Sequence, residues 1–450
     1  MKRYCLLVIN LLIIAMLASA CSGTTNKSDN GQSGDISQNG QTEAENQKIA
    51  LKMMGWEASP LETQSVKNGL ASFMKSNPNI TVEYTTVPGT NYLSKLMTML
   101  AGNAAPDVFF CATDYYRTLA KRGQLLDITE RFIDSEYKEE DFLPGTMKLM
   151  KVDGKLYGVI SCIVGPELFY NKEIFDKAGL PYPPSDPAKA WTWDEFREVA
   201  KKLTVKDGDK VTQHGAYGFE AQYVTTALIM GNEGKIFNDT YDKMFINNPE
   251  AKQVFEAVLN LRKADNAAPD AITLEKVGMQ PHQMLQTGKV AMLADGSWSL
   301  QELAQMNFEV GVGVLPKFKE SVTHVQAHMH SAWANTKYPN EAWKLVAYLS
   351  SDEYQTQNVK EGLWLPDRKS LYTEEGMEKW YSEEIYGEEF KSMVDWFINA
   401  DVYPYAMVGN SKVNDIYTEV TDMYWHADRD IDSTLSELET RVNEELSKGQ

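Results

Sequence analysis

The sequence predicts an α/β fold built in two domains. Short apolar strands alternate with amphipathic helices from residue 49 to residue 111, which is the pattern of a parallel α/β sheet. About 400 residues follow the amino-terminal segment, and a single hydrophobic core stops growing well below that length. The composition, 43% hydrophobic and 24% charged, is typical of a soluble globular protein. Together these observations indicate two α/β domains.

The first elements are predicted from the spacing of their apolar residues. Strands show runs or alternation of apolar residues, whereas helices show them three and four positions apart. In chain order we expect a strand at 49–54, a helix at 60–75, a strand at 80–87, a helix at 92–100 and a strand at 107–111. Trp56 should directly follow the first strand.

Later helices are marked by their starting signals. Thr192 and Glu195 have the spacing of a capping box, which predicts a helix beginning at Trp193. Asn248, followed by Pro249, predicts a second helix start. Two further helices are expected at 340–349 and 432–446.

The amino terminus predicts export. Lys2 and Arg3 precede an apolar run at 5–17, which is too short to span a bilayer and is followed by small residues. Residues 1–20 are therefore predicted to be a signal peptide. The run 17–21 resembles a lipobox, so Cys21 is expected to carry a lipid and to hold the protein on the extracellular face of the cell membrane. The alternative is an ordinary secretory cleavage that leaves Cys21 as a spare thiol.

Residues 21–47 are predicted to form a lipidated cysteine followed by a flexible linker. After Cys21 this segment consists mainly of Ser, Gly, Asn, Gln, Asp and Thr, with Ile36 as its one large apolar residue. Such a composition buries too little surface to compensate for the entropy lost on ordering. The segment suits a tether that holds a globular part away from the membrane.

Charge and motifs exclude several classes of function. The net charge of −19 argues against nucleic acid as a partner and against direct binding to an anionic membrane, since both need basic patches. We expect membrane contact through the lipid anchor alone. The chain contains no P-loop, no Gly-x-Ser-x-Gly and no His-Glu-x-x-His motif, so no cofactor and no metal is predicted. Cys111 and Cys162 lie in apolar runs and are expected to be buried thiols, although a bridge between them stays open.

A series of short motifs, in the same order along the chain, resembles the family 1 extracellular solute-binding proteins, which include the maltose-binding proteins. The motifs lie at 77–84, 96–101, 105–109, 121–127, 154–158, 170–179, 192–196, 288–292, 295–298, 313–316 and 340–343. They cover nearly the whole chain after the linker.

The resemblance implies two lobes joined by crossing segments, with a ligand in the cleft between them and closure by hinge bending. Crossings are expected near 159–165, near 313–316 and after Leu349. The implied lobes comprise residues 48–162 with about 316–358, and 163–315 with about 359–450. The protein would be a monomer that captures a sugar or oligosaccharide and delivers it to the permease subunits of an ABC importer.

Sugar clefts combine aromatic platforms with polar side chains, because sugars have apolar faces and many hydroxyls. Four tryptophans stand at predicted loops or strand ends: Trp56, Trp298, Trp333 and Trp364. The family's Gly-x-Trp motif implies a stacking role for Trp298. The competing interpretation for each tryptophan is packing in the core.

The polar candidates stand near the predicted strand ends, and the resemblance implies ligand contact for several of them. Asp114 and Tyr115 follow the strand at 107–111 in a predicted loop. The other candidates are Glu57, Glu167, Gln222, Tyr223 and Asp295. The competing interpretation is a solvated loop residue or a helix cap.

Three histidines invite a metal interpretation. His324, His328 and His330 would share one face of a strand, but nearby Pro and Gly predict a loop, and the spacing matches no recognised zinc site. We expect instead that His330 faces the cleft and forms a hydrogen bond to the ligand.

Two alternatives to a sugar-binding protein stay open. A secreted glycosidase would also contain tryptophans and paired carboxylates. A binder of another solute, such as a peptide or a polyamine, would share the fold but need different side chains in its cleft.

Overall fold

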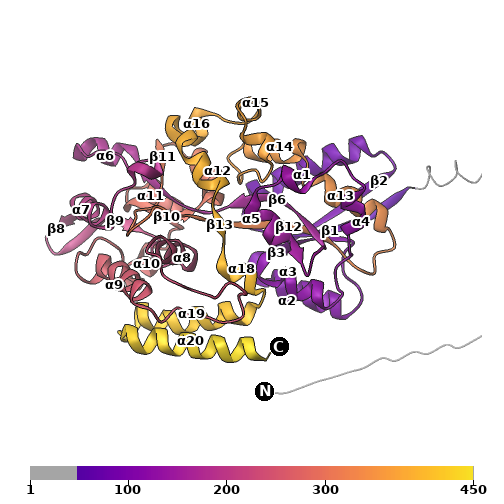
Figure 1. The fold of residues 1–450 in the computed structure, drawn as a ribbon. Coiled ribbons are helices and arrows are strands. Elements are labelled where there is room, and N and C mark those ends of the chain that lie inside the picture. The colour runs from indigo at the N-terminus through magenta and orange to yellow at the C-terminus, as the bar shows by residue number, and fades with distance from the viewer. Residues whose placement is uncertain (1–47, 449–450) are drawn as a thin grey trace, which may run out of the picture. The chain divides into compact units, whose positions relative to one another are not determined.

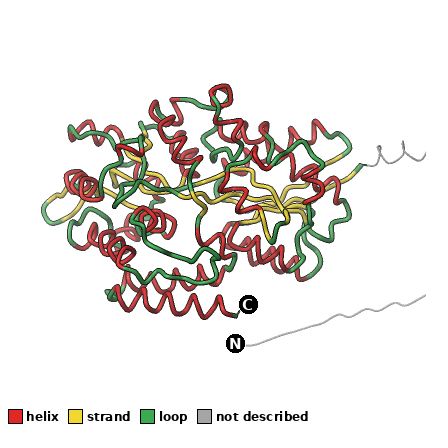
Figure 2. Tube along the Cα trace, in the orientation of Figure 1, coloured by secondary structure: helices red, strands yellow, loops and turns green. Residues whose placement is uncertain are grey.

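The computed structural model describes residues 48–448, and the chain from residue 48 onward forms one compact unit. The predicted signal peptide (1–20) and linker (21–47) lie outside the described residues. The unit contains two main sheets, and helices lie along the faces of both (Figures 1 and 2). Within 48–448, every helix is too short or too polar to cross a bilayer.

The first sheet has six strands in the order β13-β12-β3-β1-β2, and β6 also pairs with β12. β1 is parallel to β2 and β3, as predicted for the start of the chain, whereas β12 is antiparallel to β3 and β6. The strands are β1 (Ile49–Glu57), β2 (Ile80–Pro88), β3 (Val108–Ala112), β6 (Gly158–Val164), β12 (His324–Ala332) and β13 (Asp401–Val402).

The second sheet has five strands in the order β11-β7-β10-β9-β8, with β9 and β10 parallel and the other pairs antiparallel. Its strands are β7 (Pro166–Asn171), β8 (Val205–Asp207), β9 (Lys210–Tyr217), β10 (Val290–Gly296) and β11 (Val310–Gly313). A separate hairpin consists of β4 (Lys151–Val152) and β5 (Lys155–Leu156).

The helices are described in three groups: those near the first sheet, those near the second sheet, and those of the carboxyl-terminal segment. Those near the first sheet are α1 (Pro60–Ser76), α2 (Gly89–Ala101), α3 (Thr113–Lys121), α4 (Thr129–Ile133), α5 (Pro144–Met150), α13 (Pro339–Tyr348) and α14 (Asp352–Val359). Those near the second sheet are α6 (Lys172–Ala178), α7 (Trp193–Leu203), α8 (Gln222–Gly231), α9 (Pro249–Lys263), α10 (Ala271–Val277), α11 (Pro281–Gln286) and α12 (Leu300–Ala304). The carboxyl-terminal helices are α15 (Glu374–Glu378), α16 (Glu383–Tyr386), α17 (Val394–Ile398), α18 (Pro404–Val408), α19 (Ser411–His426) and α20 (Ile431–Ser447).

Local sequence explains where the predicted helices begin. The capping box at the start of α7 is confirmed: Thr192 accepts a hydrogen bond from the Glu195 amide, and the Glu195 carboxylate accepts one from the Thr192 amide. Asn248 caps α9 in the predicted place, with Pro249 at its first position. Each cap satisfies amides that would otherwise lack partners at a helix start.

The first passage of the chain between the sheets lies where it was expected, at 159–165. On the return, Lys317 and Glu320 still bond to the second sheet's side, so the chain crosses after the expected 313–316. β6 belongs to the first sheet and β7 to the second, with Gly165 between them. A Cβ atom on Gly165 would lie 2.6 Å from the His324 carbonyl oxygen, so only glycine fits this close approach. β11 and β12 mark the return. The short strand β13, which the predicted boundaries place in the second lobe, pairs with β12 of the first sheet. The lobe boundaries remain a prediction.

Three local predictions were wrong. β1 continues to Glu57, so Trp56 lies in the strand and not after it. Asp114 lies in the first turn of α3, and not in a loop. Residues 324–332 form β12, although nearby Pro and Gly predicted a loop; pairing on both edges, with β3 and β6, outweighs those local signals.

Cys111 and Cys162 are buried and free, as the apolar runs around them predicted. Cys111 lies on β3 and Cys162 on β6, and β12 pairs with both strands. Two strand spacings separate the thiols, about 10 Å, which exceeds the reach of a disulfide.

Candidate ligand-binding site

A cavity of about 340 Å³ lies where elements of both sheets meet the carboxyl-terminal helices. From the first sheet and its helices come Trp56, Ala112, Thr113, Asp114, Val164, Gln326, Ala327 and His328. From the second sheet's side come Gln222, Tyr223 and Trp298, and from the region of α18 and α19 come Tyr403, Ala406 and Asn414. Part of the predicted set therefore lines one cavity: Trp56, Asp114, Gln222, Tyr223 and Trp298.

Strand direction explains why these residues meet. β1 and β3 are parallel neighbours, so Trp56 and Asp114 stand at the same carboxyl edge of the first sheet. β9 and β10 are parallel neighbours in the second sheet, and Tyr223 and Trp298 follow their carboxyl ends. Ligands of α/β proteins bind at this edge because the strand ends leave a crevice there.

Trp56 is held from several sides by other rings. Its ring is edge-on to Tyr92, with centroids 5.4 Å apart, and to Phe110 and His328, each at 4.9 Å. Trp56 remains partly exposed where it lines the cavity. The three edge contacts fix the orientation of the indole before any ligand arrives.

Trp298 is placed by the glycine two residues before it. The Trp298 ring lies so close to Gly296 that a Cβ atom there would be 2.3 Å from the ring carbons. The ring is also edge-on to Tyr223, with a centroid distance of 5.1 Å and an interplanar angle of 75°. Trp298 is partly exposed and lines the cavity.

Asp114 offers an unused acceptor at the cavity. Its Oδ1 atom is buried and has no hydrogen-bond partner within the described part of the chain. Burial raises the pKa of its carboxyl from 3.8 to about 6. Asn414 hydrogen-bonds to the same carboxyl group and also accepts a hydrogen bond from the Gln222 amide at 3.4 Å. The group therefore connects α3 to α8 and α19.

Asp295 supports the cavity from behind. Its Oδ1 accepts hydrogen bonds from the Tyr223 hydroxyl and the Gly296 amide, both at 2.8 Å, and its Oδ2 accepts one from the Ser299 hydroxyl at 2.6 Å. Asp295 does not line the cavity. It was predicted as a ligand contact, and the structure gives it the role of fixing Tyr223.

Glu167 lies opposite Asp295 on the neighbouring strand β7. It is fully buried, and neither carboxylate oxygen has a hydrogen-bond partner among the described residues. Burial, together with the nearby charge of Asp295, raises the pKa of Glu167 well above its ordinary value. Glu167 does not line the cavity.

The remaining predicted aromatics are buried away from the cavity. Trp364 is 1% exposed and packs edge-on behind His328, with ring centroids 4.5 Å apart. Trp333, at the end of β12, is buried and forms a backbone bridge to Leu125. Trp364 thus lies behind the cavity wall, whereas Trp333 lies at the opposite edge of the first sheet, next to the start of β3.

The other polar candidates also point elsewhere. His330 is fully buried, and its Nε2 atom lies 2.9 Å from the Ser161 hydroxyl, so it does not face the cleft as expected. Tyr115 is buried in α3 beside Asp114. Glu57 ends β1 and accepts a hydrogen bond from the Thr86 hydroxyl at 3.4 Å. We leave these three residues out of the proposed site.

The sequence analysis did not identify several of the lining residues as ligand contacts. They are Thr113, Gln326, His328, Tyr403 and Asn414. Gln326 and His328 are partly exposed positions of β12 that alternate with buried ones, and this period of two was the available signal. Burial lowers the pKa of His328 to about 3, so the ring is neutral, and its Nδ1 atom has no partner within the described structure.

The cavity is unsuited to a metal or to an anion. No group of three His, Cys, Asp or Glu side chains in the described chain is arranged to hold a metal ion. The residues that line the cavity include no Lys or Arg, so nothing there would neutralise a phosphate or carboxylate ligand.

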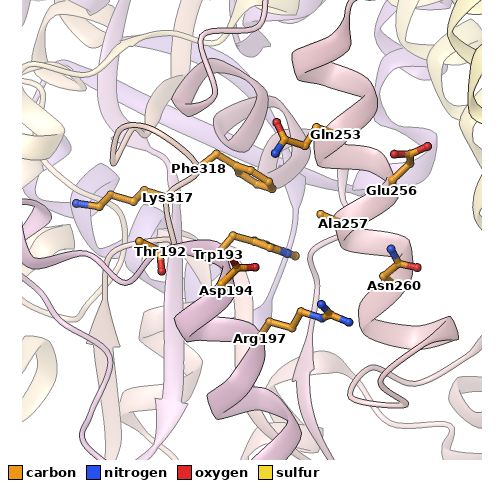
Figure 3. A pocket seen from close by; sticks show the side chains of 10 residues that line it. All are labelled: Thr192, Trp193, Asp194, Arg197, Gln253, Glu256, Ala257, Asn260, Lys317 and Phe318. Carbon is orange, nitrogen blue, oxygen red and sulfur yellow. The ribbon is translucent and has the colours of Figure 1, made fainter.

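A larger hollow, of about 460 Å³, lies between α7 and α9 (Figure 3). Its aromatic floor is a stacked pair, Trp193 and Phe318, with ring centroids 5.2 Å apart. Arg197 on its edge is paired through two hydrogen bonds with Asp265. These groups already satisfy one another, and no residue of the first sheet's side contributes, so the smaller cavity is the better candidate.

Comparisons with known proteins show relatives that match most of the chain. An uncharacterized ABC transporter extracellular-binding protein of Pyrococcus horikoshii is 26% identical over 356 residues, which cover 77% of this chain and 78% of that protein. The galactooligosaccharide-binding protein of Bacillus subtilis is 23% identical over 69% of this chain and 71% of its own length. The ABC substrate-binding protein of Listeria monocytogenes, solved in complex with cycloalternan, superimposes with a TM-score of 0.78 at 23% identity and covers 89% of this chain and 99% of its own.

The family is shown by a match that spans most of the folded chain. Residues 58–356 match the family model of the bacterial extracellular solute-binding proteins. This stretch contains both sheets apart from β1 and β13, and it includes Asp114, Tyr223 and Trp298 of the cavity. The solved relatives share the two-lobed fold that the motifs predicted. The chain therefore belongs to the family of bacterial extracellular solute-binding proteins.

Proposed function

We propose that this protein captures a neutral sugar in the cavity between its two sheets and delivers it to the permease of an ABC importer. One observation carries the proposal: two partly exposed tryptophans, Trp56 and Trp298, line the same cavity as the unpartnered Oδ1 atom of Asp114. An aromatic ring covers the apolar face of a sugar, and a buried acceptor needs a donor such as a sugar hydroxyl.

The volume of the cavity favours a short sugar. At about 340 Å³ it lies near the lower end of the roughly 300 to 1,000 Å³ typical of small-molecule sites. One or two sugar rings suit that space better than a long oligosaccharide. The amides of Gln222, Gln326 and Asn414 supply both donors and acceptors for hydroxyls in varied orientations.

Charge separates a neutral sugar from other solutes. An anionic ligand would need cationic side chains, and the lining contains none. A polyamine would need several converging carboxylates, whereas Asp114 is the one carboxylate of the lining. The names of the Bacillus and Listeria relatives refer to a galactooligosaccharide and to cycloalternan, which supports the sugar class.

A glycosidase is the rival function, and the cavity argues against it. Glycoside hydrolysis uses two carboxyl groups that flank the scissile bond, roughly 5 to 9.5 Å apart. The lining offers Asp114 and no second carboxyl group. Incubation with oligosaccharides should release no reducing ends; appearance of reducing ends that Asp114→Ala abolishes would favour the enzyme.

The first prediction concerns the lining residues. Trp298→Ala and Asp114→Ala should each weaken sugar binding, the latter at least about tenfold, because a hydrogen bond to a buried carboxylate contributes roughly 1.5 to 3 kcal/mol. A thermal-shift screen of mono- and disaccharides identifies the sugar, and calorimetric titration then measures the affinity of each variant.

Matched substitutions outside the cavity serve as controls. Trp343→Ala on α13 and Asp415→Ala on α19 remove the same kinds of side chain from positions that do not line the cavity. Trp343→Ala should keep the affinity of the unmodified protein. Asp415 raises the pKa of Asp114 through its charge, so exposed Asp207→Ala on β8 is the better carboxylate control and should also keep it. Lower melting temperature with unchanged affinity in Trp298→Ala and Asp114→Ala would contradict the site.

The second prediction concerns location. We propose that Cys21 is lipidated and that the protein acts as a monomer on the outer face of the cell membrane, since the amino-terminal sequence has an export signal. Cys21→Ala should release the protein into the medium or leave an uncleaved precursor, which fractionation and mass measurement detect. A processed variant that stays on the membrane would refute lipid anchoring.

A further inference from the structure

A second cavity lies behind the first. It has a volume of about 290 Å³, and its lining includes Tyr217, Phe219, Glu220, Leu261 and Asp295. Tyr223 lines both cavities, and it is the single residue that the two linings have in common among the described residues. Tyr223 therefore stands between the proposed sugar cavity and this rear cavity.

Tyr223 is fixed in that position by contacts at both ends. Its hydroxyl donates a hydrogen bond to Asp295 at 2.8 Å, and its carbonyl accepts one from the His324 Nε2 atom at 2.8 Å. Its ring is edge-on to Trp298. The backbone contact belongs to the start of α8, whereas the hydroxyl contact alone holds the end of the side chain.

Asp295 keeps other donors if Tyr223 leaves. The Gly296 amide still bonds to Oδ1 and the Ser299 hydroxyl to Oδ2, so the carboxylate stays satisfied. The place of the Tyr223 hydroxyl on Oδ1 then becomes free for another hydroxyl donor. The arrangement thus allows exchange of Tyr223 for a hydroxyl group of a ligand.

We propose that Tyr223 is a specificity-determining residue that limits ligand length: hydrogen-bonded to Asp295, it closes the sugar cavity against the rear cavity, and its removal admits a longer sugar. This inference rests on the proposed sugar-binding function and adds a size limit to it.

The chemistry of the rear cavity suits an additional sugar ring. Tyr217 and Phe219 supply aromatic surface, and Asp295 supplies an acceptor next to it. Glu220, which also lines this cavity, is paired with Arg262 and so is already occupied. With Tyr223 in place none of these groups is within the sugar cavity, so a short ligand gains nothing from them.

The test compares sugars of increasing length. Maltose, maltotriose and maltotetraose, and the galactose-containing series of the same lengths, are titrated into the unmodified protein and into Tyr223→Ala. We expect the unmodified protein to gain no affinity beyond the length that fills the first cavity. Tyr223→Ala should prefer the next longer sugar by about tenfold relative to the unmodified protein. Tyr223→Phe, which loses the hydrogen bond to Asp295 but keeps the ring, should shift the preference less.

Tyr217→Ala is the matched control, because Tyr217 lines the rear cavity but not the first. It enlarges the space behind Tyr223 without opening it, so the length preference should stay unchanged. Equal loss of affinity for all lengths in Tyr223→Ala would overturn the proposal and make Tyr223 a plain contact residue.

A ligand-free crystal structure of Tyr223→Ala decides the question independently of any sugar. A continuous cavity that joins the two supports the proposal, and collapse of neighbouring side chains into the gap overturns it. If the unmodified protein binds none of the sugars, the proposed function fails, while this structure still tests whether Tyr223 separates the cavities.

Discussion

Asp114 combines two properties that oppose each other in the free protein. Its carboxyl lies at the cavity with one oxygen unpartnered, and burial raises its pKa from 3.8 to about 6. The ionised form of Asp114 is therefore destabilised until a hydrogen-bond donor binds to it. A sugar hydroxyl supplies that donor, so the ligand and the proton compete for the same oxygen.

The third prediction follows from this competition. A bound hydroxyl stabilises ionised Asp114 and lowers its pKa in the complex, so binding releases protons and weakens as pH falls through about 6. We expect a flat dissociation constant from pH 7 to 8 and a rise of at most about tenfold per pH unit below pH 6. Calorimetric titration across pH 4.5 to 8 measures it.

Asp114→Asn is the control for this pH dependence, because it keeps the shape and removes the titration. Its affinity should not fall below pH 6. The stability difference between the ligand-free unmodified protein and Asp114→Asn should change in the opposite direction. A folded-state pKa above the unfolded value means that the contribution of Asp114 to stability increases as pH falls from about 6 toward 4. A contribution of Asp114 to stability that falls over this range would contradict the assignment.

The sequence predicted some of the residues that line the cavity. It could not predict which of the candidate side chains face the cavity and which are buried behind its wall. Trp298 and Trp364 both stand at positions predicted as loops or strand ends, yet Trp298 lines the cavity and Trp364 lies behind His328. Strand-end position predicts the neighbourhood, whereas the side-chain direction depends on packing across elements. Tyr403, just before α18, and Asn414, in α19, lie nearly 300 residues after Asp114, so no local sequence pattern predicts that they meet it.

Among the elements, the junction at the end of β10 positions Trp298 in the cavity lining. β10 ends at Gly296, and the 3-10 turn Ser297–Ser299 follows at once. The Trp298 ring lies against Gly296, and Asp295 binds both the Gly296 amide and the Ser299 hydroxyl. Hydrogen bonds to the Asp295 carboxylate therefore hold both ends of the turn.

The fourth prediction tests this junction. Gly296→Ala would place a Cβ atom 2.3 Å from the Trp298 ring, so the ring must move away from its position. We expect weaker sugar binding with a modest loss of stability, because Trp298 is partly exposed and has space on the cavity side. Calorimetry and melting curves give both values. Gly89→Ala, at the exposed start of α2, where the nearest atom to an added Cβ is 4.0 Å away, is the comparison for general backbone effects. Unchanged affinity in Gly296→Ala would mean that the ring position does not matter for binding.

Element prediction succeeded where local signals and tertiary packing agreed. The helix expected at 60–75 is α1 (Pro60–Ser76), and the capping box at Thr192 starts α7. It failed at β12, where Pro and Gly nearby predicted a loop. β12 is stabilised by pairing with β3 and β6, which are distant in sequence, so that strand depends on contacts that a local window does not contain.

At the scale of the whole molecule, the two sheets are linked by a short connection at Gly165, by the return from β11 to β12, and by the carboxyl-terminal segment, which contacts elements of both sides. Few linking segments of this kind let two lobes rotate about them without breaking either sheet. The proposed cavity lies between the lobes, so rotation changes its access to solvent. Binding and lobe movement are therefore expected to be coupled.

The fifth prediction is that a bound sugar makes the molecule more compact. Small-angle scattering should give a smaller radius of gyration with a saturating sugar, identified by the thermal-shift screen, than without it. The Trp298→Ala variant at the same sugar concentration serves as the control, since it should remain in the ligand-free form. An unchanged radius, with binding confirmed by calorimetry, would argue against closure.

The two free cysteines make the folded part of the chain convenient for optical sensing. Cys111 and Cys162 are buried, and burial raises the pKa of both thiols, so neither offers a reactive thiolate at the surface. A cysteine introduced at exposed Asp415, next to Asn414 at the cavity edge, would be the single site for a thiol-reactive dye in a chain beginning at Lys48. Its fluorescence would report occupancy of the cleft without replacement of either native cysteine.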